Sequence, residues 1–584
     1  MRIERHQVGR AAVLAAREDF ANRIGGQVRS MSRAGRMATY EWQSIADEFL
    51  DYLGALSVET PDLDTPEARA ALKDASEAAA GAVAYAAYHP HCTFQIFLDY
   101  VNFGMGYDPG EDAPAESVTP GEWIDALCLA TLRDKAKWHG EAFHFARQKF
   151  AEREQGTPAG ELITGLTAMI LDDTGDDEEY PPSAQAKLGA VDAALDRIRA
   201  RTEETGETLL DRPDSTALRA LRALAAEDRE AFDSALADLL FAHAALHGST
   251  ASPSSLLPLV PLGLAAFAYR TLGWMPALQT HYLPHALVTG FESSGPRVGG
   301  FGRDRRPDAA AALAAGPLVV DRPARDGEVN PESEALFHRY TQEALTPEDG
   351  EALAASKLEN AMRYQELLFT WRAGNSADVT DAQLANLRLA SQLGAALFRI
   401  ALAEPGTEAE VTVAGRALRY PASRREASAG SWENATVFAL ITGVRQDLAP
   451  LVLTGPAFAG KDGSAYTAYR EALHAYLTGV DSEQAVERAL REAEKAKDWG
   501  FFPRPAVLLS QLVEGDEESF NLALADALEA HRDHYQVADR AGDADATVDL
   551  EVLALACHAR RRGWEIRVES PYLPQRLLRA AQPF

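Results

Sequence analysis

Cysteine is scarce in this chain, and the few residues present do not form a recognisable set. The 584 residues include three cysteines, Cys92, Cys128 and Cys557, and no two of them are spaced as a CxxC pair. An odd number of widely separated cysteines predicts neither a disulfide framework nor a zinc ribbon. Free thiols persist in a reducing compartment, so the composition is typical of a cytoplasmic protein.

A long hydrophobic run is also missing. The longest apolar stretch, 256–268, is shorter than the roughly 20 residues that span a bilayer, and Pro258 and Pro261 interrupt it. The first residues, Met1 to His6, mix charges and contain no apolar core of a signal peptide. We therefore expect a protein that is not integral to a membrane and that acts in the cytoplasm.

Positive charge is in deficit. Lys and Arg total 57 against 87 Asp and Glu, which gives a net charge of −30. Such a field repels nucleic acid and anionic membranes and attracts basic proteins, so we expect no nucleic acid and no membrane as a partner. The same charge also keeps a protein soluble, and this second interpretation stays open. The densest acidic stretch is 172–179.

Two stretches resemble nucleotide or metal sites but lack essential features. Residues 455–462 resemble a P-loop, but no Ser or Thr follows Lys461, and the carboxylate of Asp462 would repel phosphate. Residues 89–92 supply two histidines and one cysteine, packed too closely for a usual tetrahedral set and without a partner cluster. We predict a loop at each place, and we expect no cofactor and no metal.

No catalytic set stands out either. His139 and His144 are five residues apart and so lie on different faces of a helix, unlike the histidines of HExxH. No Ser/His/Asp combination or Gly-rich phosphate loop is evident. His243 and His531 each end an apolar helical stretch, where packing or capping is the expected role. We therefore name no catalytic residue.

What the chain does contain is a long internal repeat. Residues 221–243 match residues 509–531 at a shift of 288 without a gap, and 12 of these 23 positions are identical. At ordinary residue frequencies, chance would give about one or two identities. The identical pairs include Phe232 with Phe520 and His243 with His531.

Blocks on either side extend the repeat. A shift of 290 aligns Arg270, Gly273 and Trp274 with Arg560, Gly563 and Trp564, and Tyr282-Leu283-Pro284 with Tyr572-Leu573-Pro574. A shift of 309 aligns Trp123 with Trp432. Both of these tryptophans lie among apolar residues at helical spacing, which is typical of the core.

The repeat predicts two copies of one domain, with 1–290 as a divergent first copy and 334–584 as the second. We interpret most of 291–333 as a linker, because it is rich in Gly, Pro and Arg and shows little periodicity, although 309–315 is expected to be a short helix. Apolar residues recur at helical spacing through most of both copies. The predicted fold class is mostly α, with two tandem homologous domains built from αα-hairpins.

Individual elements are predicted near the C-terminus. Residues 519–531 and 549–562 form one αα-hairpin, in which Phe520, Leu524 and Leu528 share a face. Gly563 follows the second helix as its C-cap. Minor β structure is expected as a hairpin at 410–420 and a strand at 565–569.

These C-terminal blocks carry a family resemblance. The segments 517–521, 525–528, 553–557, 562–564 and above all Val568-Glu569-Ser570-Pro571-Tyr572-Leu573-Pro574 resemble the immunity protein 49 family. The resemblance covers Trp432 to Leu578. It is weaker in the first copy, where Gln279-Thr280-His281 replaces Glu569-Ser570-Pro571. The motifs are a family pattern and not a mechanistic site.

The resemblance implies a helical immunity protein of an actinobacterial polymorphic toxin system, which acts in competition between bacteria by binding and blocking a cognate toxin. The negative charge indicates a basic toxin, such as a nuclease, neutralised by stoichiometric binding without catalysis. Two alternatives stay open: a helical scaffold or regulator of another protein, and an enzyme with an unrecognised helical site. The oligomeric state stays unknown. The residues that carry the family pattern, in a structural or a binding role, are Trp123, Phe232, His243, Gly273, Trp274, Tyr282, Pro284, Trp432, Phe520, His531, Gly563, Trp564, Glu569, Tyr572 and Pro574.

Overall fold

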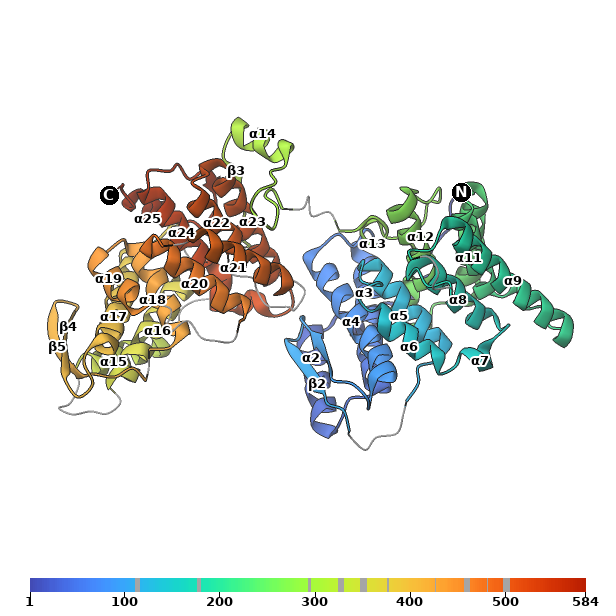
Figure 1. Ribbon diagram of the computed structural model, residues 1–584, viewed down its shortest axis with the longest axis horizontal. Helices are drawn as coiled ribbons and strands as arrows, with labels where there is room; N and C mark the ends of the chain where they lie inside the picture. Colours follow the sequence, from blue (N-terminus) through green and yellow to red (C-terminus); the bar gives the residue numbers. More distant parts are fainter. Residues whose placement is uncertain are drawn as a thin grey trace. The chain divides into compact units, whose positions relative to one another are not determined.

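A computed structural model of the chain describes residues 1–110, 116–175, 180–291, 296–323, 330–346, 354–374, 378–425, 427–455, 463–480, 482–496 and 505–583. The chain divides into two compact units, unit 1 at Met1–Glu292 and unit 2 at Ser293–Phe584 (Figure 1). Helices make up most of both units, which confirms the predicted mostly-α fold class.

Unit 1 contains helices, one hairpin and two short 3-10 turns among its described residues. The helices are α1 (Arg10–Arg17), α2 (Phe20–Ala34), α3 (Thr39–Glu59), α4 (Pro66–Tyr88), α5 (Pro120–Leu132), α6 (Gly140–Gln148), α7 (Ala151–Glu154), α8 (Pro158–Ile170), α9 (Ala184–Thr205), α10 (Pro213–Ala225), α11 (Arg229–Leu246), α12 (Leu259–Leu272) and α13 (His285–Thr289). The hairpin strands are β1 (Phe94–Leu98) and β2 (Phe103–Tyr107), and the 3-10 turns are η1 (Leu209–Asp211) and η2 (Pro253–Leu256).

Unit 2 has a similar composition. Its helices are α14 (Pro307–Ala315), α15 (Pro331–Ala344), α16 (Ala354–Ala373), α17 (Asp381–Leu402), α18 (Ala429–Thr442), α19 (Arg445–Thr454), α20 (Ala465–Thr478), α21 (Ser482–Ala496), α22 (Ala506–Glu514), α23 (Glu517–Tyr535), α24 (Leu550–Arg561) and α25 (Gln575–Ala580). Its strands are β3 (Leu318–Val319), β4 (Glu408–Val413), β5 (Arg416–Pro421) and β6 (Val568–Glu569), and its 3-10 turns include η4 (Arg540–Gly542) and η5 (Ala544–Thr547).

The repeated helices begin and end on matching residues. Asp228 and Asp516, at the shift of 288, are the N-caps of α11 and α23 and accept hydrogen bonds from backbone N–H groups three residues on. Gly273 and Gly563 follow α12 and α24 with φ angles of 67° and 91°, a left-handed conformation that favours glycine. The polar and glycine positions of the repeat therefore set the helix boundaries.

The same order of packing recurs in the two units. In unit 1, α3 packs on α4, α4 on α5, and α5 on α12; in unit 2, α16 packs on α17, α17 on α18, and α18 on α24. A two-stranded antiparallel hairpin follows α4 and α17 in turn. The αα-hairpin predicted near the C-terminus is α23 with α24, which contact each other in the core of unit 2.

Of the predicted β structure, the hairpin at 410–420 is confirmed as β4 and β5, with Val411 paired to Leu418. The strand predicted at 565–569 is shorter, because β6 contains Val568 and Glu569 alone. It pairs in parallel with β3. The hairpin β1–β2 of unit 1 was not predicted.

The segment interpreted as a linker differs most from the prediction. Among its described residues, the predicted helix at 309–315 is confirmed as α14, but Val298, Leu313 and Val320 are at most 2% exposed and belong to the core of unit 2. These apolar residues lie among glycines, prolines and arginines, so no periodicity reveals them. The predicted second copy begins at residue 334 and would therefore leave these three core residues outside unit 2, which begins at Ser293.

One segment of the described residues, Pro253–Leu272, is apolar and long enough by composition to cross a membrane. It spans η2 and α12, and 56% of the apolar window is buried inside unit 1. Helix α12 packs on α5, α10 and α13. This is also the pattern of a core helix in a soluble domain, so the segment does not establish a membrane span.

Candidate functional site

The family-pattern residues come together in equivalent pairs in the two units. Phe232 of α11 is 1% exposed and its ring centroid lies 6.1 Å from that of Trp274. Phe520 of α23 is fully buried and lies 5.5 Å from Trp564. In each unit the glycine before the tryptophan ends a helix and turns the chain back toward the phenylalanine. The pairs therefore join consecutive helices of the repeat.

A second pair joins the other end of the same helix to the Tyr-Leu-Pro block. His243 lies 5.4 Å from Tyr282 in an edge-to-face arrangement, and His531 lies 5.1 Å from Tyr572 in the same arrangement. Pro284 and Pro574 are the N-caps of α13 and α25. Glu569 is exposed, and its backbone carbonyl accepts a hydrogen bond from Val320 N.

In each unit a short extended segment pairs with the residues just before the Tyr-Leu-Pro block. Ile3 N donates to Gln279 O at 3.0 Å, as Val320 N donates to Glu569 O at 3.0 Å. Two residues on, Arg5 donates to His281 O and Arg322 donates to Pro571 O, each at 3.3 Å. The shift between these residues is 317, outside every recognised block. In the sequence, only the similarity of Ile3-Glu4-Arg5 to Val320-Asp321-Arg322 could have revealed that these two segments are equivalent.

Trp123 and Trp432 are core residues, as predicted. They are 0% and 3% exposed, and their indole N–H groups donate to Phe143 O and Leu451 O, each at 3.0 Å. Carbonyls in the last turns of α5 and α18, the helices that bear them, are bound by the half-buried Arg270 and the buried Arg561. Their role in the described structure is packing.

The arginine that binds each helix end shows that the sequence alignment is wrong by one residue at this position. Arg270 donates to Thr131 O and Leu132 O of α5, and Arg561 donates to Leu440 O and Ile441 O of α18. Arg560, which the shift of 290 pairs with Arg270, donates instead to Trp564 O at 3.2 Å. The run Arg560-Arg561-Arg562 makes the register ambiguous in sequence, and the shared capping contacts resolve it.

A hollow of about 310 Å³ lies beside this cap in unit 2. It is lined by Leu440, Val444, Tyr476, His558 and Arg561, among others. Burial, with the nearby Arg562 and Arg561, lowers the pKa of His558 to about 4, so its imidazole is neutral. Its Nε2 lies 2.9 Å from the Tyr476 hydroxyl. These groups satisfy one another, and the lining is mainly apolar.

Unit 1 has a cluster of histidines at the C-terminal end of α11, beside Tyr282. His6 lies 6.1 Å from His243 and 5.5 Å from His247 between ring centroids. Ser255 Oγ donates its own proton to Ser252 O and therefore accepts from His6 Nε2, so Nδ1 of a neutral His6 accepts from the Tyr282 hydroxyl, 2.7 Å away, which itself accepts from His6 N. His6 Nε2 then donates to Ser255 Oγ at 2.9 Å. This network fits a neutral imidazole.

We expect the free energy of unfolding of unit 1 to fall as the pH drops below about 6.5, the unfolded histidine pKa. Burial, together with the neighbouring histidines and Arg5, lowers the pKa of His6, and burial and His247 lower that of His243. The unfolded chain then binds more protons than the folded one, so stability present at pH 7 is lost on acidification. Hydrogen exchange of α11 and the first ten residues at pH 7 and at pH 5.5 measures this loss. His6→Gln should reduce it, and an unchanged pH dependence in that variant would contradict the assignment.

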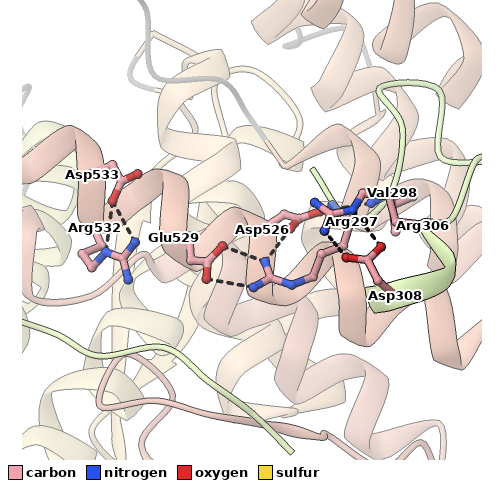
Figure 2. Close-up of polar contacts among 8 residues, drawn as sticks. All are labelled: Arg297, Val298, Arg306, Asp308, Asp526, Glu529, Arg532 and Asp533. Carbon is pink, nitrogen blue, oxygen red and sulfur yellow. Dashed lines mark hydrogen bonds and ion pairs between the residues drawn. The ribbon is translucent and has the colours of Figure 1, made fainter. Parts of the chain in front are cut away.

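Unit 2 has an additional element over α23, the strap, which we define as residues 296–317. Figure 2 shows the Arg297 side chain lying along α23, where it donates to Asp526 Oδ1 at 2.7 Å and to both Glu529 oxygens at 2.6 and 2.9 Å. The N–H groups of Arg297 and Val298 donate to Asp526 Oδ2. The bidentate pairing raises the pKa of Arg297 and fixes the strap to the helix.

The residues that resemble metal or nucleotide sites in the sequence make ordinary structural contacts where the structure describes them. His89 is buried and stacks on Tyr85, with its Nε2 3.1 Å from an Arg36 nitrogen. His144 lies 2.8 Å from Asp173. Within the part of the chain that the structure describes, no three His, Cys, Asp or Glu residues are grouped to hold a metal ion. Most of the P-loop-like stretch, 456–462, and the acidic residues 176–179 lie outside the described residues.

Comparison with known proteins gives one match. A family model described as Immunity protein 49 matches residues 60–287 and again 375–577. Both matches begin just before equivalent helices, α4 and α17, and end in the helices α13 and α25 after the Tyr-Leu-Pro block. No curated protein and no solved structure matches the chain. The strap and the helices α1–α3, α15 and α16 lie outside the matched residues.

Proposed function

The chain belongs to the immunity protein 49 family as a tandem duplication, and from this we propose that it protects its producing cell by binding one cognate toxin in the cytoplasm. The observation that carries the proposal is the double family match, which spans most of each unit. Binding is stoichiometric and involves no turnover. The toxin belongs to a polymorphic toxin system of the kind that actinobacteria use against neighbouring cells.

The chemistry of the surface supports a basic toxin. The net charge of −30 gives the protein a field that accelerates encounter with a positively charged partner. Toxins that cleave nucleic acid need a basic face to hold phosphates, so a nuclease matches this field best. Neutralisation then requires that the immunity protein cover or distort the active site with a few buried contacts and complementary charges.

The proposal is tested by isolating the toxin encoded beside this gene and expressing it with and without the protein. Survival of cells that express both, together with a complex that co-purifies at a fixed ratio, is the expected result. Survival without any complex would favour an enzyme acting on the toxin's product. A complex with other cellular proteins, and none with the toxin, would favour a scaffold.

Salt should slow association of the protein with its toxin. We expect the association rate constant to fall about ten-fold or more between low and high salt, since exposed charges are screened beyond about 10 Å at 0.1 M. The dissociation rate constant should change less, because contacts already formed are screened less. Stopped-flow mixing across a salt series measures both constants. An association rate that does not depend on salt would remove the electrostatic part of the proposal.

A further inference from the structure

The two copies of the repeat differ in what covers one helix face. On α23 of unit 2, the face that carries Asp526 and Glu529 lies under the strap (Figure 2). Leu522 is fully buried in the same apolar cluster as Val298 and Leu313 of the strap. Nearer the start of α23, Arg305 pairs with Glu518 at 2.7 Å and approaches Asp516 at 3.9 Å. Two arginines, eight residues apart, therefore bind the acidic residues of this face.

The corresponding face of α11 in unit 1 keeps the same acidic residues. At the shift of 288, Asp516, Glu518 and Asp526 correspond to Asp228, Glu230 and Asp238. Residues Ser234, Asp238, Phe241, Ala242 and Ala245 recur at helical spacing and are all exposed. We call this set, together with Glu230, the α11 face.

No described part of unit 1 covers the α11 face. Phe241 is 47% exposed, whereas Phe232 on the opposite side of the same helix is 1% exposed. Among the described residues, Glu230 and Asp238 have no ion pair, whereas their counterparts in unit 2 are each bound by an arginine. Phe241 follows Asp238 by about one helical turn, so the face presents an aromatic ring near a carboxylate, and both groups attract a guanidinium.

We propose that the α11 face is a docking site for an arginine-bearing segment of the partner protein, held as the strap is held on α23. This inference rests on the proposed function in taking the toxin as that partner. Asp238 is the counterpart of the carboxylate that binds both the Arg297 guanidinium and two backbone N–H groups in unit 2. The carboxylate of Asp238 can accept the same hydrogen bonds as that of Asp526. The carboxylate of Glu230 corresponds to that of Glu518, which pairs with Arg305 in unit 2.

The exchange of Glu529 for Phe241 changes the contact without losing the preference for arginine. In unit 2, Arg297 makes a bidentate pair with Glu529. In unit 1, the ring of Phe241 stands at that position, and an aromatic face attracts a guanidinium as well as apolar atoms. A basic, partly apolar segment therefore matches the α11 face better than an acidic one does.

The strap itself supplies a defined probe. A fluorescent peptide of residues 296–317 is titrated into the full chain, whose own strap already covers α23. We expect saturable binding to the wild type and a rise of at least about ten-fold in Kd for Glu230→Lys/Asp238→Lys. Glu203→Lys/Glu204→Lys, which places the same charges on exposed positions of α9, should leave Kd nearly unchanged. Phe241→Ala should weaken binding without reversing any charge. A peptide of scrambled sequence gives the charge-only background.

Several results would overturn the inference. They are absence of saturable binding, equal binding of the scrambled peptide, and an equal loss in the α9 control. Toxin binding separates the two proposals: if the toxin binds wild type and Glu230→Lys/Asp238→Lys alike, the docking site is wrong and the proposed function stands. If peptide binding behaves as expected but the wild type does not bind the toxin, the proposed function fails and the docking site remains.

Discussion

Replacing Arg561 with alanine is expected to lower the free energy of unfolding of unit 2 by about 3–5 kcal/mol. Arg561 is 7% exposed and donates to Leu440 O and Ile441 O, two carbonyls in the last turn of α18. Each hydrogen bond from a charged donor contributes about 1.5–3 kcal/mol, and its loss leaves a buried carbonyl without a partner. Hydrogen exchange resolved by peptide reports the opening of unit 2 separately from unit 1.

The neighbouring arginine provides the matched control. Arg560 is only partly buried, and among the described residues its side chain donates one hydrogen bond, to Trp564 O. Arg560→Ala should cost less than about 1 kcal/mol. Arg270→Ala should destabilise unit 1 as Arg561→Ala destabilises unit 2, because it binds the equivalent carbonyls of α5. A larger loss for Arg560→Ala than for Arg561→Ala would restore the register that the sequence suggested.

Phe520→Ala is expected to cost about 3–5 kcal/mol in unit 2, the usual effect of truncating a buried aromatic ring. Phe520 is fully buried and joins α23 to Trp564 across the repeat. Its counterpart Phe232, 1% exposed beside Trp274, should give a similar loss in unit 1. The same hydrogen-exchange measurement on each unit records both losses.

Phe241→Ala serves as the control on the same helix type. Its ring is 47% exposed on α11, so its removal should change stability by no more than about 0.5 kcal/mol. A loss below about 1 kcal/mol for Phe520→Ala would place that ring at the surface. It would also undo the helix face shared with Leu524 and Leu528.

Features that repeat locally could be predicted from the sequence. The match of 221–243 with 509–531 gave two equivalent helices, and the structure aligns their N-caps, Asp228 and Asp516. Periodicity was sufficient to locate these helices, and Gly273 and Gly563 mark the ends of the helices that follow them, α12 and α24. The structure and the double family match confirm the tandem arrangement.

Features that depend on contacts far apart in sequence could not be predicted. The strap was interpreted as a linker because Val298 and Leu313 are isolated among glycines and arginines, and their partners on α23 lie more than 200 residues away. The parallel pairing of β3 with β6 has the same cause. The α11 face could not be predicted either, because an exposed aspartate alone does not indicate a binding site, and the contact of its counterpart Asp526 with Arg297 is visible only in the structure.

Measuring toxin activity against increasing amounts of the protein tests the central claim most directly. At toxin concentrations well above Kd, we expect a linear loss of toxin activity that ends sharply at a fixed small molar ratio, with the toxin recovered unmodified. Complete protection by the protein at far below one molecule per toxin would show turnover. That result would contradict neutralisation by binding and would identify the chain as an enzyme.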